Sequence, residues 1–237
     1  MSAALNDPKI AHVLSGYKRF RENGMSVLSP KFAMLSNEGQ NPHTCLVGCS
    51  DSRADGAIIF DTEPGDIFSV RNVANMIPAY KPPGESTENG VVAAIEYAVT
   101  ALKTPLLLVM GHSQCGGCAH ALNVVTKNRD LCVAMHGEGG VPSTVDRWCF
   151  TMKEAVCGVI DKFDPQIRGR QLELENVRLS VKRVSEYPWV KDAVKAGTLQ
   201  VRGAFFQVFD GRLFVLGTDD DFYDAGSGGK MAERVGW

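Results

Sequence analysis

Two short apolar segments of the sequence are followed directly by side chains that can bind a metal or move protons. The first segment ends at Cys49, with Asp51 and Arg53 close behind it, and the second leads into His112 and Cys115. Two thiolates and one imidazole form a Cys₂His set, which suits zinc and leaves one tetrahedral position unassigned. Three protein ligands with an open fourth position are typical of catalytic zinc, which turns a bound water into a nucleophile.

The fourth position around such a metal has two candidate occupants. Asp51 could bind the metal itself and close the site. Alternatively, the planar guanidinium of Arg53 could hold the Asp51 carboxylate in a bidentate grip, which would leave the position to water. The spacing leaves both arrangements open, so the state of the site depends on which partner Asp51 takes.

The segments that deliver these side chains are predicted to be neighbouring strands of a parallel sheet. Each is short and apolar, and a helical stripe of apolar residues over 91–102 precedes the second. Strand, helix and strand at this spacing predict parallel βαβ units, whose sites form at the carboxyl ends of the strands. The predicted strands are 44–49, 67–70 and 105–110, followed by a hairpin of 199–209 and 212–216 around the turn Asp210-Gly211.

Apolar residues at helical spacing predict the remaining elements. An N-terminal helical arm covers about 6–38, with Asn6 as the cap of its first helix and a second helix that follows Pro30. Further helices are predicted over 145–163, 177–184 and 188–196. The fold class is therefore α/β, with a mostly parallel β-sheet flanked by helices and an added antiparallel strand or hairpin near the C-terminus.

Length and composition favour one soluble domain. The 237 residues include 25 Lys and Arg against 27 Asp and Glu, a net charge of −2, which argues against a nucleic-acid partner. No apolar run approaches the roughly 18 residues of a membrane span, and no secretory signal is visible. The seven cysteines are therefore expected to be reduced thiols. The protein is expected to be cytoplasmic, or to lie in an organelle if a transit segment was removed. We expect a single domain over 1–237, with a poorly ordered tail from about 219 to 237.

Four runs of the sequence resemble the β-class carbonic anhydrases. They follow one another in the order of the family and at its separations, and the resemblance covers residues from about 6 to 217. The runs are CSDSR at 49–53, FSVRNVAN at 68–75, AIEYAV at 94–99 and GHSQCGG at 111–117. The resemblance implies a zinc enzyme that reversibly hydrates CO₂ to bicarbonate and a proton, by attack of zinc-bound hydroxide.

The resemblance also implies a role for individual residues. Cys49, His112 and Cys115 would bind one Zn²⁺ per subunit, and Asp51 and Arg53 would form a catalytic dyad beside it. The implied substrate-binding residues are Gln40, Phe68, Val73, Tyr97 and Gly116. In this family the site lies at a dimer interface, where the partner supplies the glutamine and part of the apolar wall. A homodimer or a higher homo-oligomer is therefore implied.

One position separates the sequence from a subgroup of the family. That subgroup carries a tryptophan three residues before the first zinc-binding cysteine, where it serves an inhibitory bicarbonate site. This sequence has Leu46 there. It therefore resembles the other subgroup, in which the zinc is open at neutral to alkaline pH.

Other functions are compatible with the same residues. Cys115 and Cys118 form a C-x-x-C pair, which also suits a dithiol oxidoreductase. Cys49 could be a nucleophile with His112 as its base and Asp51 as orienter, although Cys115 then has no role. The same zinc could hydrolyse COS or CS₂, or belong to a protein that binds bicarbonate without turning it over. The remaining cysteines are expected to be buried apolar residues: Cys45, Cys132, Cys149 and Cys157.

Overall fold

The computed structural model describes residues 5, 7–82, 84–85, 89–127 and 143–232. The chain comprises two compact units, Met1–Asn41 and Pro42–Trp237. No helix in the described part of the chain is long and apolar enough to cross a membrane. The assignment of all 237 residues to one domain stays a prediction.

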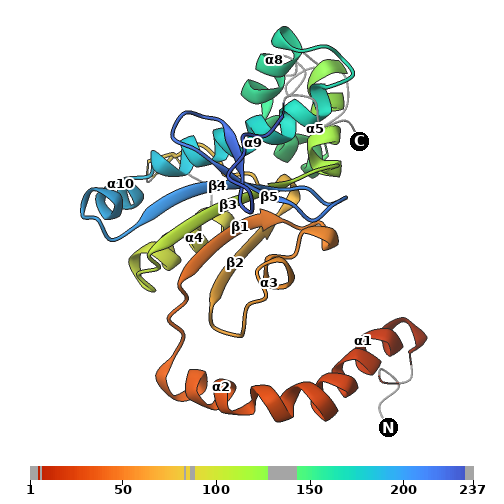
Figure 1. Cartoon of the computed structure of the whole chain (residues 1–237), viewed down its shortest axis with the longest axis vertical. Helices are drawn as coiled ribbons and strands as arrows, with labels where there is room; N and C mark the ends of the chain where they lie inside the picture. Colours follow the sequence, from red (N-terminus) through yellow and green to blue (C-terminus); the bar gives the residue numbers. More distant parts are fainter. Residues whose placement is uncertain (1–4, 6, 83, 86–88, 128–142, 233–237) are drawn as a thin grey trace. The chain divides into compact units, whose positions relative to one another are not determined.

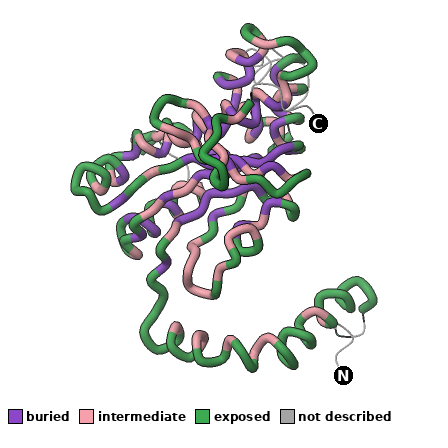
Figure 2. The backbone as a smooth tube through the Cα atoms, viewed as in Figure 1, coloured by how far each residue is buried: buried purple, intermediate pink, exposed green. Residues whose placement is uncertain are grey.

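The N-terminal unit is helical and has no buried helix residue (Figure 2). It consists of α1 (Pro8–Arg19), a π-helical turn η2 (Phe20–Gly24) and α2 (Met25–Glu38). The cap of α1 is Asp7, not the predicted Asn6, because the Asp7 carboxylate accepts the N–H of Lys9 at 2.9 Å. The second helix begins at Met25 rather than after Pro30, since the backbone stays helical through the π turn.

The Pro42–Trp237 unit is built on a six-stranded sheet in the order β2-β1-β3-β4-β5-β6 (Figure 1). The first four strands of that order run parallel, and β5 and β6 are added antiparallel. This confirms the predicted α/β class, with its antiparallel addition near the C-terminus. The strands are β1 (Thr44–Cys49), β2 (Ile67–Asn72), β3 (Leu106–His112), β4 (Gln200–Phe206), β5 (Leu213–Leu216) and β6 (Phe222–Asp224).

Alternate side chains of the central strands enter two separate cores, because successive residues of a strand point to opposite faces. Cys45 and Val47 of β1 belong to the core that includes α4, α9 and α10, whereas Leu46 packs with β3, β4 and α3. The helices concerned are α3 (Gly56–Ile59), α4 (Gly90–Thr100), α9 (Arg168–Ser185) and α10 (Pro188–Lys195). The two central strands of the parallel part are thus buried on both faces (Figure 2).

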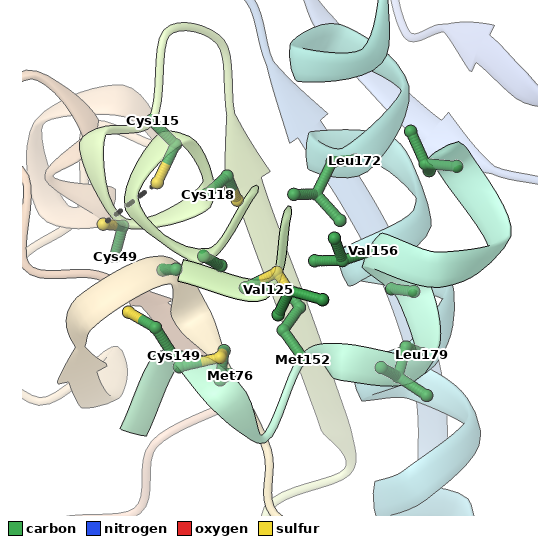
Figure 3. Packing of buried hydrophobic residues seen from close by; sticks show 14 residues of the cluster. Cys49, Met76, Cys115, Cys118, Val125, Cys149, Met152, Val156, Leu172 and Leu179 are labelled. Carbon is green, nitrogen blue, oxygen red and sulfur yellow. Dashed lines mark hydrogen bonds between the residues drawn. The ribbon is translucent and has the colours of Figure 1, made fainter. Parts of the chain in front are cut away.

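A third core lies beyond the carboxyl ends of β1 and β3 (Figure 3). Helices α5 (Gly116–Lys127), α7 (Thr144–Phe150), α8 (Lys153–Lys162) and α9 enclose it. Its buried members include three sulfur-bearing side chains that recur below, Cys49, Cys115 and Cys118. The short 3₁₀ turns η3 (Ser52–Ala54) and η4 (Val73–Asn75) follow β1 and β2 on the same side of the sheet.

Two predicted segments differ from the structure. The helix expected over 145–163 is broken between α7 and α8, where the Thr151 hydroxyl donates to the Trp148 carbonyl at 2.7 Å and Met152 turns into the core. The tail that was expected to be poorly ordered, from about 219 to 237, contains β6 in its described part, and its last residues, 233–237, lie outside the described residues. Phe222 is only 2% exposed and packs against Phe205, and this apolar contact holds the strand on β5.

Candidate metal centre

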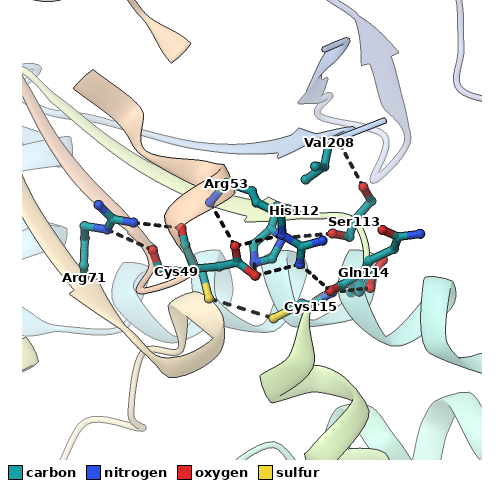
Figure 4. A network of polar contacts seen from close by, with 10 residues as sticks. Cys49, Arg53, Arg71, His112, Ser113, Gln114, Cys115 and Val208 are labelled. Atoms are coloured by element: carbon teal, nitrogen blue, oxygen red, sulfur yellow. Dashed lines mark hydrogen bonds and ion pairs between the residues drawn. The ribbon is translucent and has the colours of Figure 1, made fainter. Parts of the chain in front are cut away.

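The two predicted ligand segments meet because their strands are neighbours. Cys49 is the last residue of β1 and His112 is the last residue of β3, and these strands pair in parallel (Figure 4). Cys115 follows in the turn after β3, and its carbonyl accepts the N–H of Ala119 as the first hydrogen bond of α5. Cys115 is therefore the N-cap of α5, and the strand ends and helix start fix all three side chains.

The three side chains form a compact, buried cluster. The Cys49 and Cys115 sulfurs lie 3.9 Å apart, and one ligand atom from each of the two cysteines and His112 lies within 4.8 Å of the others. The exposed fraction is 5% for Cys49, 2% for Cys115 and 1% for His112. Two sulfurs and one imidazole nitrogen at this separation match the donor set of a tetrahedral zinc site.

The imidazole of His112 is oriented for metal binding. Its Nδ1 lies 2.9 Å from the Ser113 carbonyl, which can only accept, so Nδ1 carries the proton. Its Nε2 is buried, and within the described part of the chain it has no hydrogen-bond partner. A buried nitrogen lone pair beside two sulfurs is costly unless something binds it, and a metal ion meets that need.

The thiols of Cys49 and Cys115 also need a nearby cation to ionise to the thiolates that bind metals. Hydrogen bonding with Cys115, together with burial, raises the pKa of Cys49 to about 12. Hydrogen bonding with the Cys118 thiol, together with burial, raises the pKa of Cys115 to about 12. Thiols bind metals as thiolates, so a divalent cation would supply the positive charge that this buried pocket lacks.

Asp51 and Arg53 form a bidentate ion pair, and Figure 4 shows Arg53 beside the cluster. Arg53 donates from Nε to Asp51 Oδ1 at 3.0 Å and from Nη2 to Oδ2 at 2.7 Å. The same Nη2 reaches the Gln114 carbonyl at 3.0 Å, which ties the pair to the turn after β3. Hydrogen bonds from Arg53 hold the pKa of Asp51 well below its usual range. Asp51 Oδ2 lies 3.9 Å from His112 Nε2, at the edge of the cluster.

Arg71 of β2 braces the turn that carries Cys49 and Asp51. Its Nε donates to the Cys49 carbonyl at 3.0 Å and its Nη2 donates to the Asp51 carbonyl at 2.8 Å. Its Nη1 pairs with the Asp55 carboxylate. Arg71 reaches this turn because it lies opposite Gly48 in the register of β1 and β2.

The structure adds Glu173 of α9, which the sequence analysis did not single out. Its Oε1 accepts the backbone N–H of Cys115 at 2.9 Å, and burial raises the pKa of this carboxyl to about 7. Its other oxygen lies 3.8 Å from Arg170 Nη1. A signal was present in the sequence, since Glu173, Asn176 and Ser180 recur at helical spacing on the buried face of α9.

Within the Pro42–Trp237 unit, the predicted substrate-binding residues lie at two separate places. Gly116 directly follows Cys115, and Val73 packs against Gly117. Phe68 and Tyr97 instead form an aromatic pair with ring centroids 6.0 Å apart. Phe68 lies opposite Cys45, four residues before Cys49 on β1, which is about 13 Å along a strand. Gln40 is an exposed residue of the N-terminal unit.

Two of the other cysteines that were predicted to be buried are fully buried, Cys45 and Cys149. Cys157 is only half-buried, and Cys132 lies outside the described residues. Cys149 Sγ lies 3.8 Å from the Gly117 carbonyl. Leu46 is 3% exposed and packs against Met110.

Comparison with known families and proteins gives consistent matches. A carbonic anhydrase family model matches residues 44–213. A mitochondrial β-carbonic anhydrase of Arabidopsis thaliana is 32% identical over 177 residues, which cover 72% of this chain and 55% of that protein. A carbonic anhydrase of Synechocystis is 30% identical over 216 residues, which cover 90% of this chain and 72% of that protein. The chain spans about half the length of the plant relatives that it matches.

Solved structures give the same result. The β-carbonic anhydrase CcaA superposes with a TM-score of 0.78 at 27% identity, over 92% of this chain and 93% of that one. One of two tetrameric β-carbonic anhydrases from Sordaria macrospora superposes with a TM-score of 0.71 at 28% identity, over 89% of this chain and 98% of that one.

Proposed function

This chain belongs to the carbonic anhydrase family, and on that premise we propose that it reversibly hydrates CO₂ to bicarbonate and a proton. The observation that carries the proposal is the buried cluster of Cys49, His112 and Cys115, with its unsatisfied imidazole nitrogen. These three residues would hold one Zn²⁺. Zinc bound by such a set supplies a Lewis acid that lowers the pKa of water, so that water can act as a nucleophile near neutral pH.

The Asp51–Arg53 pair would orient the attacking water. The Arg53 guanidinium keeps the Asp51 carboxylate ionised and holds it in the ion pair. Asp51 is then not the fourth ligand of the zinc, and that position is left for water. Oδ2 then presents a lone pair near His112 Nε2, where it can accept a hydrogen bond from water. Leu46 in place of the subgroup tryptophan supports the same open arrangement.

The substrate pocket would combine residues of two subunits. Val73 and Gly116 lie next to the cluster in one chain and would form its near wall. We propose that Phe68, Tyr97 and Gln40 contribute to the site of a second copy. The position of Phe68 supports this division, because on β2 it lies opposite Cys45, a residue about 13 Å along β1 from Cys49.

Self-association is supported by an apolar face on a helix of the N-terminal unit. Val13 is 64% exposed and Tyr17 is 59% exposed, one helical turn apart on α1. Exposed aromatic and aliphatic residues at this spacing are typical of a face that another protein surface covers. We propose a homodimer or a higher homo-oligomer; the Sordaria proteins are described as tetrameric. For location we propose the cytoplasm or an organelle, and the named plant relatives are mitochondrial and chloroplastic.

Stopped-flow CO₂ hydration at mildly alkaline pH tests the proposal, after the zinc content of the purified chain has been measured. We expect turnover that is proportional to enzyme and lost when a chelator removes the metal. Parallel assays with COS and CS₂ separate the hydrolase alternative. Stoichiometric zinc without any CO₂ turnover would overturn the proposed reaction and favour a protein that only binds bicarbonate.

A further inference from the structure

Cys118 is a buried thiol that lies in the same core as the metal cluster without belonging to the cluster. It is 2% exposed and shares the third core with Cys49 and Cys115, whereas the cluster itself consists of Cys49, His112 and Cys115. Figure 3 shows Cys49, Cys115 and Cys118 together at the edge of the third core. The proposed reaction gives Cys118 no role.

The start of α5 places both cysteines of the C-x-x-C pair in one helical turn. Cys115 is the N-cap of α5 and Cys118 is the third residue of that helix, and an N-cap side chain lies on the side of the first-turn residues. Gly116 and Gly117 separate them. A Cβ on Gly117 would come within 2.8 Å of both Val73 and Ala74, so this turn is packed tightly against η4. The pair is therefore held in a close, fixed arrangement.

We propose that Cys115 and Cys118 form a redox-modification site, at which a hydroperoxide converts the dithiol into a disulfide and so removes one metal ligand. This inference rests on the proposed function for its starting point, since a metal-bound Cys115 is a thiolate and thiolates are the reactive form. Hydrogen peroxide is the smallest oxidant of this class.

The disulfide would form in two steps. The Cys115 thiolate attacks one peroxide oxygen, the O–O bond breaks, and a sulfenic acid and hydroxide result. The Cys118 thiol then attacks the sulfenic sulfur, its proton leaves with the sulfenic oxygen as water, and the S–S bond forms. Both sulfurs are oxidised, and the peroxide is reduced to one water and one hydroxide.

Cys118 is better placed than Cys49 to complete this reaction. Cys49 also lies close to Cys115, at 3.9 Å between sulfurs, but as a ligand it would be held by the metal. Cys118 would not be, so it can attack the sulfenic acid as soon as that forms. Without this second thiol, the sulfenic acid is open to further oxidation to sulfinic acid, which thiol reductants do not reverse.

The test exposes the full-length, zinc-loaded protein to hydrogen peroxide and follows zinc release with a chromogenic chelator. Peptide mapping after alkylation, without reduction, identifies the disulfide. We expect a Cys115–Cys118 link whose appearance parallels zinc release, and recovery of zinc binding after a thiol reductant and zinc are added. The variant Cys118→Ala keeps all three cluster residues, and it should form no such link and lose the reductant-recoverable fraction of zinc binding.

Cys149→Ala is the matched control, because Cys149 is buried beside the same turn but lies outside the C-x-x-C pair. It should behave as the wild type does. A Cys49–Cys115 link in place of Cys115–Cys118, or equal recovery of zinc binding by Cys118→Ala and the wild type, would overturn the inference. The metal-free chain is treated in parallel. If the purified protein never binds zinc, the proposed function fails, but peptide mapping of the peroxide-treated chain still shows whether Cys115 and Cys118 form a disulfide.

Discussion

At the scale of single residues, Cys45 and Cys49 show how position on one strand separates a packing role from a binding role. Both are buried on β1, but only Cys49 lies at the carboxyl end, beside His112 and Cys115. We predict that Cys49→Ser loses stoichiometric zinc and CO₂ hydration together, because a serine hydroxyl does not ionise readily enough to replace a thiolate ligand. Zinc per chain is measured by elemental analysis.

Cys45→Ala is the control for this prediction. It removes a buried thiol from the same strand at a cost of about 1 kcal/mol of stability, without touching the cluster. It should keep its zinc. A Cys49→Ser protein that retained one zinc per chain would show that Cys49 is not a ligand.

The Asp51–Arg53 pair gives a second prediction at this scale. Arg53→Ala and Arg53→Lys should both keep zinc and lose turnover by about tenfold or more, because neither side chain can grip Asp51 through two parallel hydrogen bonds. Steady-state CO₂ hydration and zinc content are measured together. Arg212→Ala is the matched control, since Arg212 forms an ion pair with Asp210, two residues earlier, as Arg53 does with Asp51, but lies elsewhere on the surface. Unchanged turnover in both Arg53 variants would remove the pair from the mechanism.

At the scale of elements, the contact between α5 and η4 fixes the position of Cys115, which directly precedes α5. A Cβ on Gly117 would lie only 2.8 Å from side-chain atoms of both Val73 and Ala74 of η4. We predict that Gly117→Ala lowers the free energy of unfolding by about 1–3 kcal/mol, because the added methyl group must push the helix start away from η4. Urea denaturation of the metal-free protein measures this.

Gly158→Ala controls for the general effect of replacing a helical glycine. Gly158 is inside α8, and among the described residues no atom apart from the adjacent backbone of that helix lies within 4 Å of a Cβ built there. This variant should therefore gain about 0.5–1 kcal/mol from helix propensity alone. If Gly117→Ala were as stable as Gly158→Ala, the α5–η4 contact would not be a tight one.

The elements differ in how far the sequence could predict them. The strand 44–49 is confirmed residue for residue, because a short apolar run that stops at polar residues has few alternatives. The site follows from two such strand ends. By contrast, η4 depends on Ala74 in the left-handed region, with φ of 65°, and alanine gives no local sign of that conformation.

The η4 backbone is held from a distance. Asn176 and Ser180 of α9 donate to the carbonyls of Ala74 and Asn75, more than 100 residues earlier in the chain. Glu173, on the same helix face, binds Cys115. A single sequence shows that these polar residues lie on a buried stripe, but their partners depend on tertiary packing. Glu173, Asn176 and Ser180 were therefore missed as supporting residues of the site, whereas its ligand candidates were found.

At the scale of the whole molecule, the proposed site needs a second copy of the chain, and the α1 face offers the way to test this. Val13 and Tyr17 lie on one exposed apolar stripe of α1, and Ser15 lies on the opposite side of that helix. We predict that Val13→Asp weakens self-association by about tenfold or more in the dissociation constant, which corresponds to about 1.4 kcal/mol. In a two-fold dimer the charge is introduced twice, so its desolvation opposes assembly twice.

Light scattering across a dilution series measures the assembly, with Ser15→Asp as the matched control. Ser15 already pairs with Arg19 at 2.9 Å, so an aspartate there gains a partner on the solvent side and should leave assembly unchanged. Zinc binding should survive in Val13→Asp, because the cluster lies within the Pro42–Trp237 unit. CO₂ turnover should fall with the dimer fraction, since the proposal assigns Phe68, Tyr97 and Gln40 to the site of the partner. Full turnover in a dilute, monomeric Val13→Asp protein would show that one chain completes the site alone.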